Sequence, residues 1–183
     1  MGYQDSLRKA WDTLSPSRKD SGCRIKFLNN EYEVNLAKKT IISLSNAVKV
    51  KDYYKILILH YLASEEKVGQ IQRGDWVSFK QMEAGEIYFP AFYKRAIEPI
   101  LKKYGDNPPL IFKRINSFGA TKIDMGTAAL SIPVFPKVNI GIVLWEGDDQ
   151  FDAGCNILFN HNTKIIFPTE DVAVLGGIVA SLI

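Results

Sequence analysis

Apolar residues at helical spacing mark two segments in the first third of the chain. In the first segment, YQDSLRKAWDTLS, they share one face of a helix. They are Tyr3, Leu7, Trp11 and Leu14. The second segment, DYYKILILHYLA (52–63), is apolar nearly all round, which is typical of a buried helix. The pattern predicts an amphipathic first helix that ends at Ser15-Pro16, and a central helix over 52–63.

Alternation of polar and apolar positions predicts strands around these helices. Residues 23–36 alternate on both sides of Asn29-Asn30 and predict a β-hairpin. The segment TIISL (40–44) adds a third strand. GDWVSF (74–79) and GEIYF (85–89) have strand propensity and predict a pair of strands joined by the KQMEA turn.

Two proline-containing segments follow and predict helices. Pro90 suits the first turn of a helix over 90–105, in which Pro99 should cause a kink or begin a new segment. Residues 107–119 begin with prolines and end at Gly119, which predicts a short helix with a glycine C-cap.

The last third of the chain predicts a sheet followed by one helix. Residues 120–124 and 127–132 flank Met125-Gly126 as a hairpin, and 137–145 has the composition of a central strand. Residues 154–159 and 163–168 predict another hairpin around 160–162. Thr169 is the natural N-cap of a closing helix, in which Gly176-Gly177 predicts close approach to another backbone.

These elements predict an α+β protein. Helices and short β-hairpins form the N-terminal part, and a closing helix covers an antiparallel sheet in the C-terminal part. At 183 residues, the chain is expected to be one domain over 1–183, large enough to bury a core without disulfides or metals.

Composition excludes several classes of partner. Hydrophobic residues make up 46% and charged residues 23%, and 23 basic against 20 acidic residues leave a net charge of +3. This balance, without a basic run, argues against nucleic-acid binding, and no apolar run spans a bilayer. The two cysteines, Cys23 and Cys155, cannot supply the four thiolates of an iron–sulfur cluster. Two free, reduced thiols are what we expect of a cytoplasmic protein.

The most acidic segment, WEGDDQFDAG, follows the predicted central strand. Its carboxylates are Glu146, Asp148, Asp149 and Asp152. They suggest a divalent-metal site or a general base, but their spacing does not match a calcium loop. A solvated turn between two strands explains the same residues, and we expect no metal there.

Histidines and nucleophile motifs give little support for an enzyme. His60 lies in the predicted buried helix, where it could be a ligand, a proton carrier or a hydrogen-bonded core residue. His161 lies in a predicted turn. Nucleophile elbows and phosphate-binding glycine loops are missing from the sequence. Catalytic residues and cofactor therefore stay unknown.

Aromatic and polar residues are concentrated between 76 and 95. Planar side chains beside Arg95 could hold a flat anionic ligand, although the same residues could form a small hydrophobic core under a loop. Trp76 and Ser78 share one face of the strand, so Trp76 should face a groove or the helix that carries Arg95. The candidate ligand-binding residues are Trp76, Ser78, Tyr88, Arg95, His60, Trp145, Asp148 and Asp149.

An ordered set of motifs resembles domain-of-unknown-function family 3786. The motifs are ILILHYL, GDWVSF, GEIYFPAFYKRAIEPI, FPKVNIGIVLWEGDDQF, ILFN and PTEDV. The resemblance implies an uncharacterised family of mainly anaerobic bacteria and archaea, some of whose members carry an iron–sulfur segment ahead of this domain. Asn160 stands where that family usually has an aspartate, which puts any chemistry of that aspartate in doubt.

Three functions are compatible with the sequence. The first is a module that binds a small molecule or cofactor in anaerobic metabolism. The second is a metal-dependent enzyme that uses Asp148, Asp149 and Asp152. The third is an interaction protein that docks on a redox or iron–sulfur partner.

Overall fold

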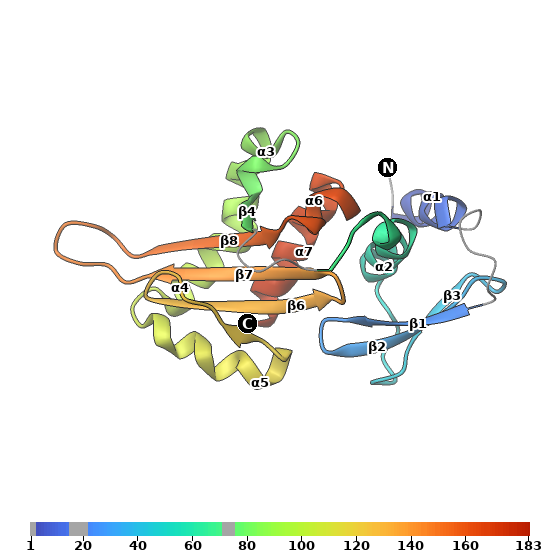
Figure 1. The fold of residues 1–183 in the computed structure, drawn as a ribbon, viewed down its shortest axis with the longest axis horizontal. Helices are drawn as coiled ribbons and strands as arrows, with labels where there is room; N and C mark the ends of the chain where they lie inside the picture. Colours follow the sequence, from blue (N-terminus) through green and yellow to red (C-terminus); the bar gives the residue numbers. More distant parts are fainter. Residues whose placement is uncertain (1–2, 15–21, 71–75) are drawn as a thin grey trace.

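The computed structural model describes residues 3–14, 22–70 and 76–183. Two antiparallel sheets lie at opposite ends of the view in Figure 1, with helices packed on both. The predicted α+β class, with N-terminal helices and hairpins and a C-terminal sheet, is confirmed. Within the described residues, no helix is long and apolar enough to cross a lipid bilayer.

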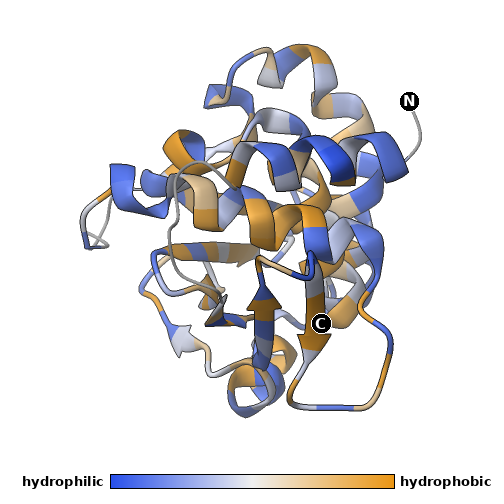
Figure 2. Ribbon diagram, turned by 90° about the vertical axis from the view of Figure 1, so that its right-hand side faces the viewer, coloured by the Kyte–Doolittle hydropathy of each residue, from blue (hydrophilic) through white to orange (hydrophobic). Residues whose placement is uncertain are grey.

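The N-terminal part contains α1 (Tyr3–Leu14) and α2 (Asp52–Ser64), packed against each other. A short 3₁₀ turn, η1 (Glu65–Lys67), follows α2. Figure 2 views this end of the molecule, where hydrophilic and hydrophobic residues both occur along the helices. Only one face of α1 is buried, at Ala10, Trp11 and Leu14, whereas α2 is apolar on nearly all sides.

Sheet A has the order β1 (Gly22–Phe27), β2 (Asn30–Asn35) and β3 (Thr40–Ser43). The pairing of Phe27 with Asn30 closes the predicted hairpin, and Leu28 in its turn has a φ of 50°. The third strand is also confirmed.

Sheet B holds the other strands in a fully antiparallel order. The order is β4 (Trp76–Ser78), β8 (Gly154–Asn160), β7 (Val138–Trp145), β6 (Ala128–Phe135) and β5 (Thr121–Lys122). The predicted hairpin around Met125-Gly126 and the central strand β7 are confirmed. One face of the sheet carries Ile140, Ile142 and Phe159, which are inaccessible to solvent.

A stack of aromatic rings joins the two halves of the core. Phe135 of β6 lies between Phe27 of β1 and Tyr61 of α2, with ring centroids 4.6 Å and 4.4 Å apart. Leu28 N–H also donates to the Val134 carbonyl. The buried apolar residues of both sheets therefore form one continuous cluster.

The prediction of a strand over 85–89 is wrong. After the 3₁₀ turn η2 (Phe79–Gln81), residues Gly85–Phe92 form helix α3, and the partner of β4 is β8. Gly85 is required here, because an added Cβ would lie 2.0 Å from the Phe79 carbonyl oxygen. Strand propensity gives way to this tight turn and to packing of the helix.

The prediction of a strand over 163–168 is also wrong, because Asn162–Ile166 form helix α6. Asn162 and Thr163 hold the turn that starts this helix. The Asn162 side chain donates to the Lys137 carbonyl, and Thr163 Oγ1 donates to Asn160 Oδ1. These side-chain bonds fold the chain back at the end of β8 instead of extending it.

A helical column runs from α3 through the π-helical turn η3 (Tyr93–Ile97) into α4 (Glu98–Tyr104). Pro99 lies in the first turn of α4, so it begins a new segment as expected. The chain then forms the 3₁₀ helix η4 (Pro108–Arg114) and α5 (Ile115–Phe118). Gly119 ends α5 with a φ of 58°, which confirms the glycine C-cap.

The closing helix α7 (Thr169–Leu182) packs mainly against η3 and also contacts α3 and α4. Its N-cap is Pro168 rather than Thr169, and the Thr169 hydroxyl donates instead to the Glu83 carbonyl at 2.7 Å. Gly176 and Gly177 do allow close approach, but to side chains of the neighbouring column. A Cβ on Gly176 would lie 2.6 Å from the Phe92 ring, and one on Gly177 would lie 3.3 Å from Arg95 Cδ.

Candidate functional site

A cavity of about 250 Å³ lies between the α3–η3 column and the first half of α7. Apolar and aromatic side chains form most of its wall, and three polar side chains stand among them. The lining residues are Phe79, Tyr88, Ala91, Phe92, Arg95, Thr169, Glu170, Ala173 and Val174. We call this the Arg95 cavity.

Two features of the sequence build the floor of this cavity. The Phe79 ring stacks on the Phe92 ring with centroids 4.0 Å apart and planes 2° apart, and both side chains are buried. The absence of a side chain at Gly176 lets α7 lie directly against Phe92. These contacts fix the separation of the two helical walls.

Arg95 lies in the π-helical turn η3, where the wider turn changes the direction of side chains relative to an α-helix. Its aliphatic stem passes Gly177 of α7, and the residue is exposed. Arg95 forms no ion pair with another described residue, although Glu170 lines the same cavity. The guanidinium is therefore available to a ligand that brings an anionic group.

Tyr88 and Arg95 are the two predicted site residues that the structure brings together. The other residues of the wall on α7, Glu170, Ala173 and Val174, were missed by the sequence analysis. The PTEDV motif contains Glu170, but an acidic residue in the first turn of a helix is also expected from the helix dipole, so the motif alone does not indicate a cavity.

Trp76 and Ser78 lie away from this cavity. The register pairs Val77 with Phe159, whose ring approaches Phe92, so the alternate residues Trp76 and Ser78 occupy the opposite face of sheet B. There the Trp76 ring covers Gly141 of β7, at 3.2 Å from an ideal Cβ position. Trp76 therefore packs on the sheet and does not face the helix that carries Arg95.

Trp145 lies on this same outer face, as the pairing register shows, and its ring covers Gly154 of β8. The residue is 44% exposed. Trp76 reaches across β8 to shield a glycine of β7, and Trp145 of β7 shields a glycine of the adjacent strand β8. Both are packing roles for an aromatic ring on a sheet surface.

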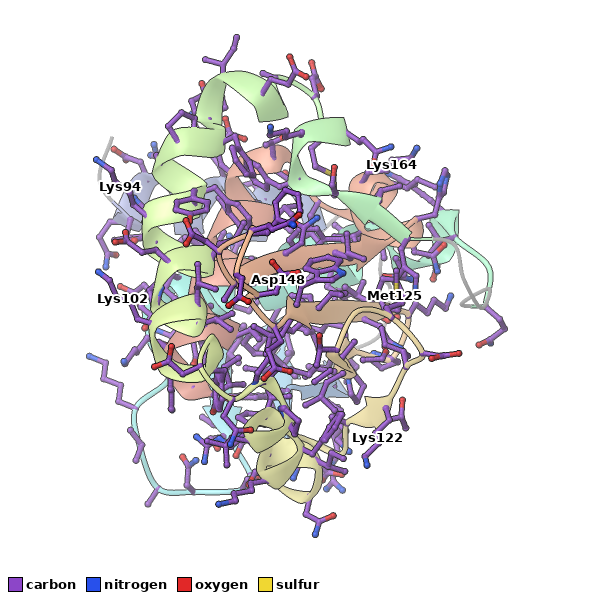
Figure 3. The ribbon with its side chains drawn as sticks, turned by 90° about the vertical axis from the view of Figure 1, so that its left-hand side faces the viewer. Lys94, Lys102, Lys122, Met125, Asp148 and Lys164 are labelled. Carbon is purple, nitrogen blue, oxygen red and sulfur yellow. The ribbon has the colours of Figure 1, made fainter. Side chains whose placement is uncertain are left out.

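Asp148 and Asp149 lie in the exposed loop between β7 and β8, in which Figure 3 labels Asp148. Asp148 Oδ1 accepts hydrogen bonds from the Gln150 and Phe151 amides at 2.8 Å, so its carboxylate shapes the turn. Asp152 is exposed as well. Within the described part of the chain, no three His, Cys, Asp or Glu side chains converge as a metal site would require.

His60 has a partner that the sequence analysis missed. Its Nδ1 lies 2.5 Å from Asp171 Oδ2 and joins α2 to α7 across 111 positions of sequence. Asp171 is buried, and His60 is part-exposed. Neither residue lines a described cavity, so this pair ties two helices together beside the Arg95 cavity.

The environment of Asn160 explains why an amide stands there. Asn160 Nδ2 donates to the Lys137 carbonyl, and Oδ1 accepts from the Asn139 amide and the Thr163 hydroxyl. An ionised aspartate could accept the last two bonds but could not donate the first. Asn160 therefore has a structural role at the end of β8.

Cys155 on β8 is not a reactive thiol. Burial raises the pKa of this thiol from its ordinary 9.0 to about 12. The thiolate, which is the nucleophilic form, is thus rare near neutral pH. The described residues offer no activated cysteine at this position.

Among the comparisons with known proteins, only the search of protein families found a match, and it agrees with the motifs of the sequence. No curated protein and no solved structure shows a significant match to the chain. The model of one family, described as "Domain of unknown function (DUF3786)", matches residues 8–181. This match covers α2, the Arg95 cavity and both sheets. The chain therefore belongs to the DUF3786 family of domains of unknown function.

Proposed function

We propose that the protein binds a small planar molecule with a carboxylate or a similar anionic group in the Arg95 cavity. The observation that carries this proposal is the position of Arg95. Its guanidinium stands in the wall of a cavity with an aromatic floor and has no ion-pair partner among the described residues. Such a combination of apolar surface and few polar groups is typical of ligand sites.

Each part of the wall has a role in recognition. The planar guanidinium can donate two parallel hydrogen bonds to a carboxylate. The aromatic rings of Tyr88 and Phe79 offer apolar surface to a flat ligand. Glu170, on the opposite helix, favours a ligand that also carries an N–H donor or a positive group. A molecule with a carboxylate at one end and an amino group at the other satisfies both walls.

The size of the cavity limits the ligand. Pockets for drug-sized ligands measure about 300–1,000 Å³, and the Arg95 cavity, at about 250 Å³, is smaller. A ligand of one or two rings fits this volume, whereas a tetrapyrrole does not. We propose binding without a reaction, because no nucleophile or general base with a positioned partner lines the cavity among the described residues.

We place this function in anaerobic metabolism. The resemblance to a family of mainly anaerobic microbes supports a ligand from anaerobic metabolism. A cytoplasmic location would keep the thiol of Cys155 reduced. Ligand screens should therefore be run without oxygen and with a reductant.

Isothermal titration with benzoate and benzamide tests the proposal. The two probes have the same ring and differ in charge, so the difference between them reports the contribution of Arg95. We expect benzoate to bind more tightly by about tenfold or more, because a hydrogen bond to a charged group contributes about 1.5–3 kcal/mol.

Arg95→Met is the matching variant, because methionine keeps an apolar stem beside Gly177. It should remove the preference for benzoate and leave the melting temperature of the free protein unchanged. Arg24→Met, at an exposed arginine of β1, is the control and should bind like the native protein. Equal binding of benzoate and benzamide, or no binding of either, would contradict the proposal.

A further inference from the structure

The free edge of β3 forms a wall of a second cavity, of about 460 Å³, which shares no residue with the Arg95 cavity. Five consecutive residues, Lys39 to Ser43, line it together with the 46–50 segment. Since side chains of a strand alternate between faces, consecutive lining residues show that the cavity follows the strand edge. We call it the β3-edge groove.

The register of sheet A determines which main-chain groups face this groove. Leu44 N–H donates to the Glu31 carbonyl, and Glu33 is paired with Ile42. Because hydrogen-bonded pairs alternate along antiparallel strands, Ile42 and Leu44 direct their main-chain groups to β2. Those of Ile41 and Ser43 point away from it. Among the described residues, neither makes a further main-chain hydrogen bond on that outer side.

The side chains around the edge combine apolar surface with positive charge. Ile42 is 52% exposed and Val48 is 69% exposed. Three lysines line the groove, and no acidic side chain does. They are Lys39, Lys49 and Lys55.

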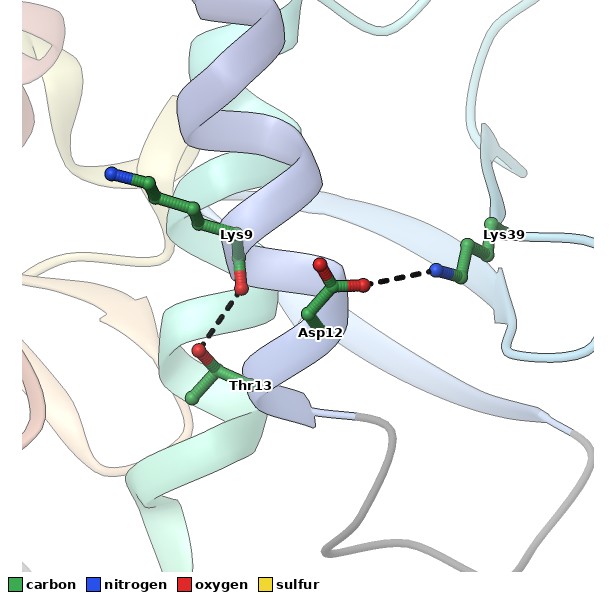
Figure 4. Close-up of polar contacts among 4 residues, drawn as sticks. All are labelled: Lys9, Asp12, Thr13 and Lys39. Atoms are coloured by element: carbon green, nitrogen blue, oxygen red, sulfur yellow. Dashed lines mark hydrogen bonds and ion pairs between the residues drawn. The ribbon is translucent and has the colours of Figure 1, made fainter.

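Two of these lysines are held in place by aspartates outside the groove. Lys39 of this groove forms an ion pair with Asp12 of α1 (Figure 4), with Nζ 3.2 Å from Asp12 Oδ1. Lys55 Nζ lies 2.8 Å from Asp52 Oδ1. Lys49 is exposed and forms no ion pair with another described residue. Lys49 is therefore the lysine best placed to attract an anionic partner.

We propose that the β3-edge groove binds an extended acidic segment of a partner protein, which adds to sheet A as a further strand beside β3. The outward N–H and C=O groups of Ile41 and Ser43 provide the main-chain hydrogen bonds for such strand addition. The side chains of this segment alternate between apolar and acidic. The apolar side chains contact Ile42 and Val48, and the acidic side chains pair with the lysines.

Charge selects this occupant over a second copy of the chain. Edge-to-edge pairing of two β3 strands would bring the lysines of one copy near those of the other. Like charges opposite each other destabilise a strand pair, and lysines at edges commonly prevent self-association. An acidic segment turns the same lysines into favourable contacts.

Fluorescence polarisation with labelled peptides tests the proposal on the full chain. The first probe is a peptide of about six residues that alternates glutamate and valine. The second peptide has lysine in place of each glutamate. The third is the acidic peptide in which every second main-chain N–H is N-methylated, so that one edge of the strand can no longer donate hydrogen bonds. The acidic peptide should bind, and its affinity should fall with added salt. The lysine peptide and the N-methylated peptide should each bind at least about tenfold more weakly, because each lost main-chain bond costs about 3–10-fold.

Two variants examine the protein side of the contact. Lys49→Glu should weaken the acidic peptide about tenfold, whereas Lys26→Glu on the exposed side of β1 should not. Ser43→Pro removes the outward N–H and should weaken binding about 3–10-fold relative to Ser43→Ala, which keeps it. Circular dichroism and melting temperature check that each variant folds.

Several results would overturn the proposal. These are failure of the acidic peptide to bind, equal binding of the lysine or N-methylated peptide, and equal effects of Lys49→Glu and Lys26→Glu. Sedimentation gives a further test: a dimer that Ser43→Pro dissociates would assign the edge to a second copy. If Ser43→Pro does not fold, the peptide series and the Lys49→Glu pair still decide the matter.

Discussion

Gly176 of α7 lies directly against the ring of Phe92, so that a Cβ added to the glycine would be 2.6 Å from Phe92 Cε2. The ring cannot yield, since its other side is stacked on Phe79 and the residue is 3% exposed. This contact sets the distance between α7 and the α3–η3 column, and thereby the width of the Arg95 cavity.

Gly176→Ala should therefore destabilise the protein. Overpacking of this kind costs about 1–3 kcal/mol of unfolding free energy, measurable by urea denaturation. Gly177→Ala is the matched control, because its Cβ meets only the flexible stem of Arg95, at 3.3 Å. Alanine is the better helix former by about 1 kcal/mol, so Gly177→Ala should be neutral or stabilising. Equal losses for the two variants would contradict this description of the interface.

The hydrogen bond between His60 and Asp171 predicts a second effect on stability. Asp171→Ala leaves His60 Nδ1 without its partner and should lower the unfolding free energy by about 1–3 kcal/mol. Glu170→Ala, at the exposed neighbouring position, should change it by less than about 0.5 kcal/mol. A double-mutant cycle with His60→Ala should give a coupling energy of about 0.5–3 kcal/mol. A coupling near zero would show that the two side chains do not stabilise each other.

Asn160→Asp provides a test of the amide at the end of β8. The carboxylate would face the Lys137 carbonyl without a proton to donate, in a position that is only 3% exposed. We expect a loss of about 1–3 kcal/mol at neutral pH. Asn156→Asp, on the same strand but without a described side-chain hydrogen bond, is the control. An Asn160→Asp variant as stable as the native protein would contradict the structural role assigned to this amide.

A thiol and a phenol whose pKa values are raised by burial predict a loss of stability at alkaline pH. Burial raises the pKa of Cys155 from 9.0 to about 12, and burial with the nearby Tyr54 raises that of Tyr32 from 10.0 to about 12. Because the folded-state pKa values are the higher ones, the stability that these groups contribute is complete below pH of about 9 and is lost as the pH rises toward 12.

Urea denaturation at a series of pH values measures this loss. Cys155→Ala together with Tyr32→Phe removes both groups and should flatten the alkaline part of the curve relative to its value near pH 8. A native curve that stays level up to pH of about 11 would contradict the burial assigned to these groups.

Local patterns in the sequence predicted most of the fold. The alternation around Asn29-Asn30 and Met125-Gly126 gave the correct hairpins, and Gly119 gave the correct helix end. The wrong strands at 85–89 and 163–168 have causes that depend on contacts distant in sequence or on side-chain bonds. Gly85 turns tightly against the Phe79 carbonyl, and Asn162 bonds to the carbonyl of Lys137.

The candidate site could be predicted only in part. Alternation correctly placed Trp76 and Ser78 on one face of β4, but it could not tell which face the helices cover. That choice depends on the pairing of Val77 with Phe159, about eighty positions later. Tyr88 and Arg95 were found because they are close in sequence, whereas the α7 wall of the cavity comes from a distant segment.

The most direct test of the Arg95 cavity is a nitrogen–proton NMR spectrum of the arginine side chains during titration with benzoate. The Arg95 Nε–Hε signal is assigned by its loss in Arg95→Met. We expect this signal to shift with benzoate and to saturate together with the amides of Glu170 and Ala173, and benzamide should leave it in place. Saturable shifts confined to other arginines, or no shift of the Arg95 signal, would contradict the proposed binding site.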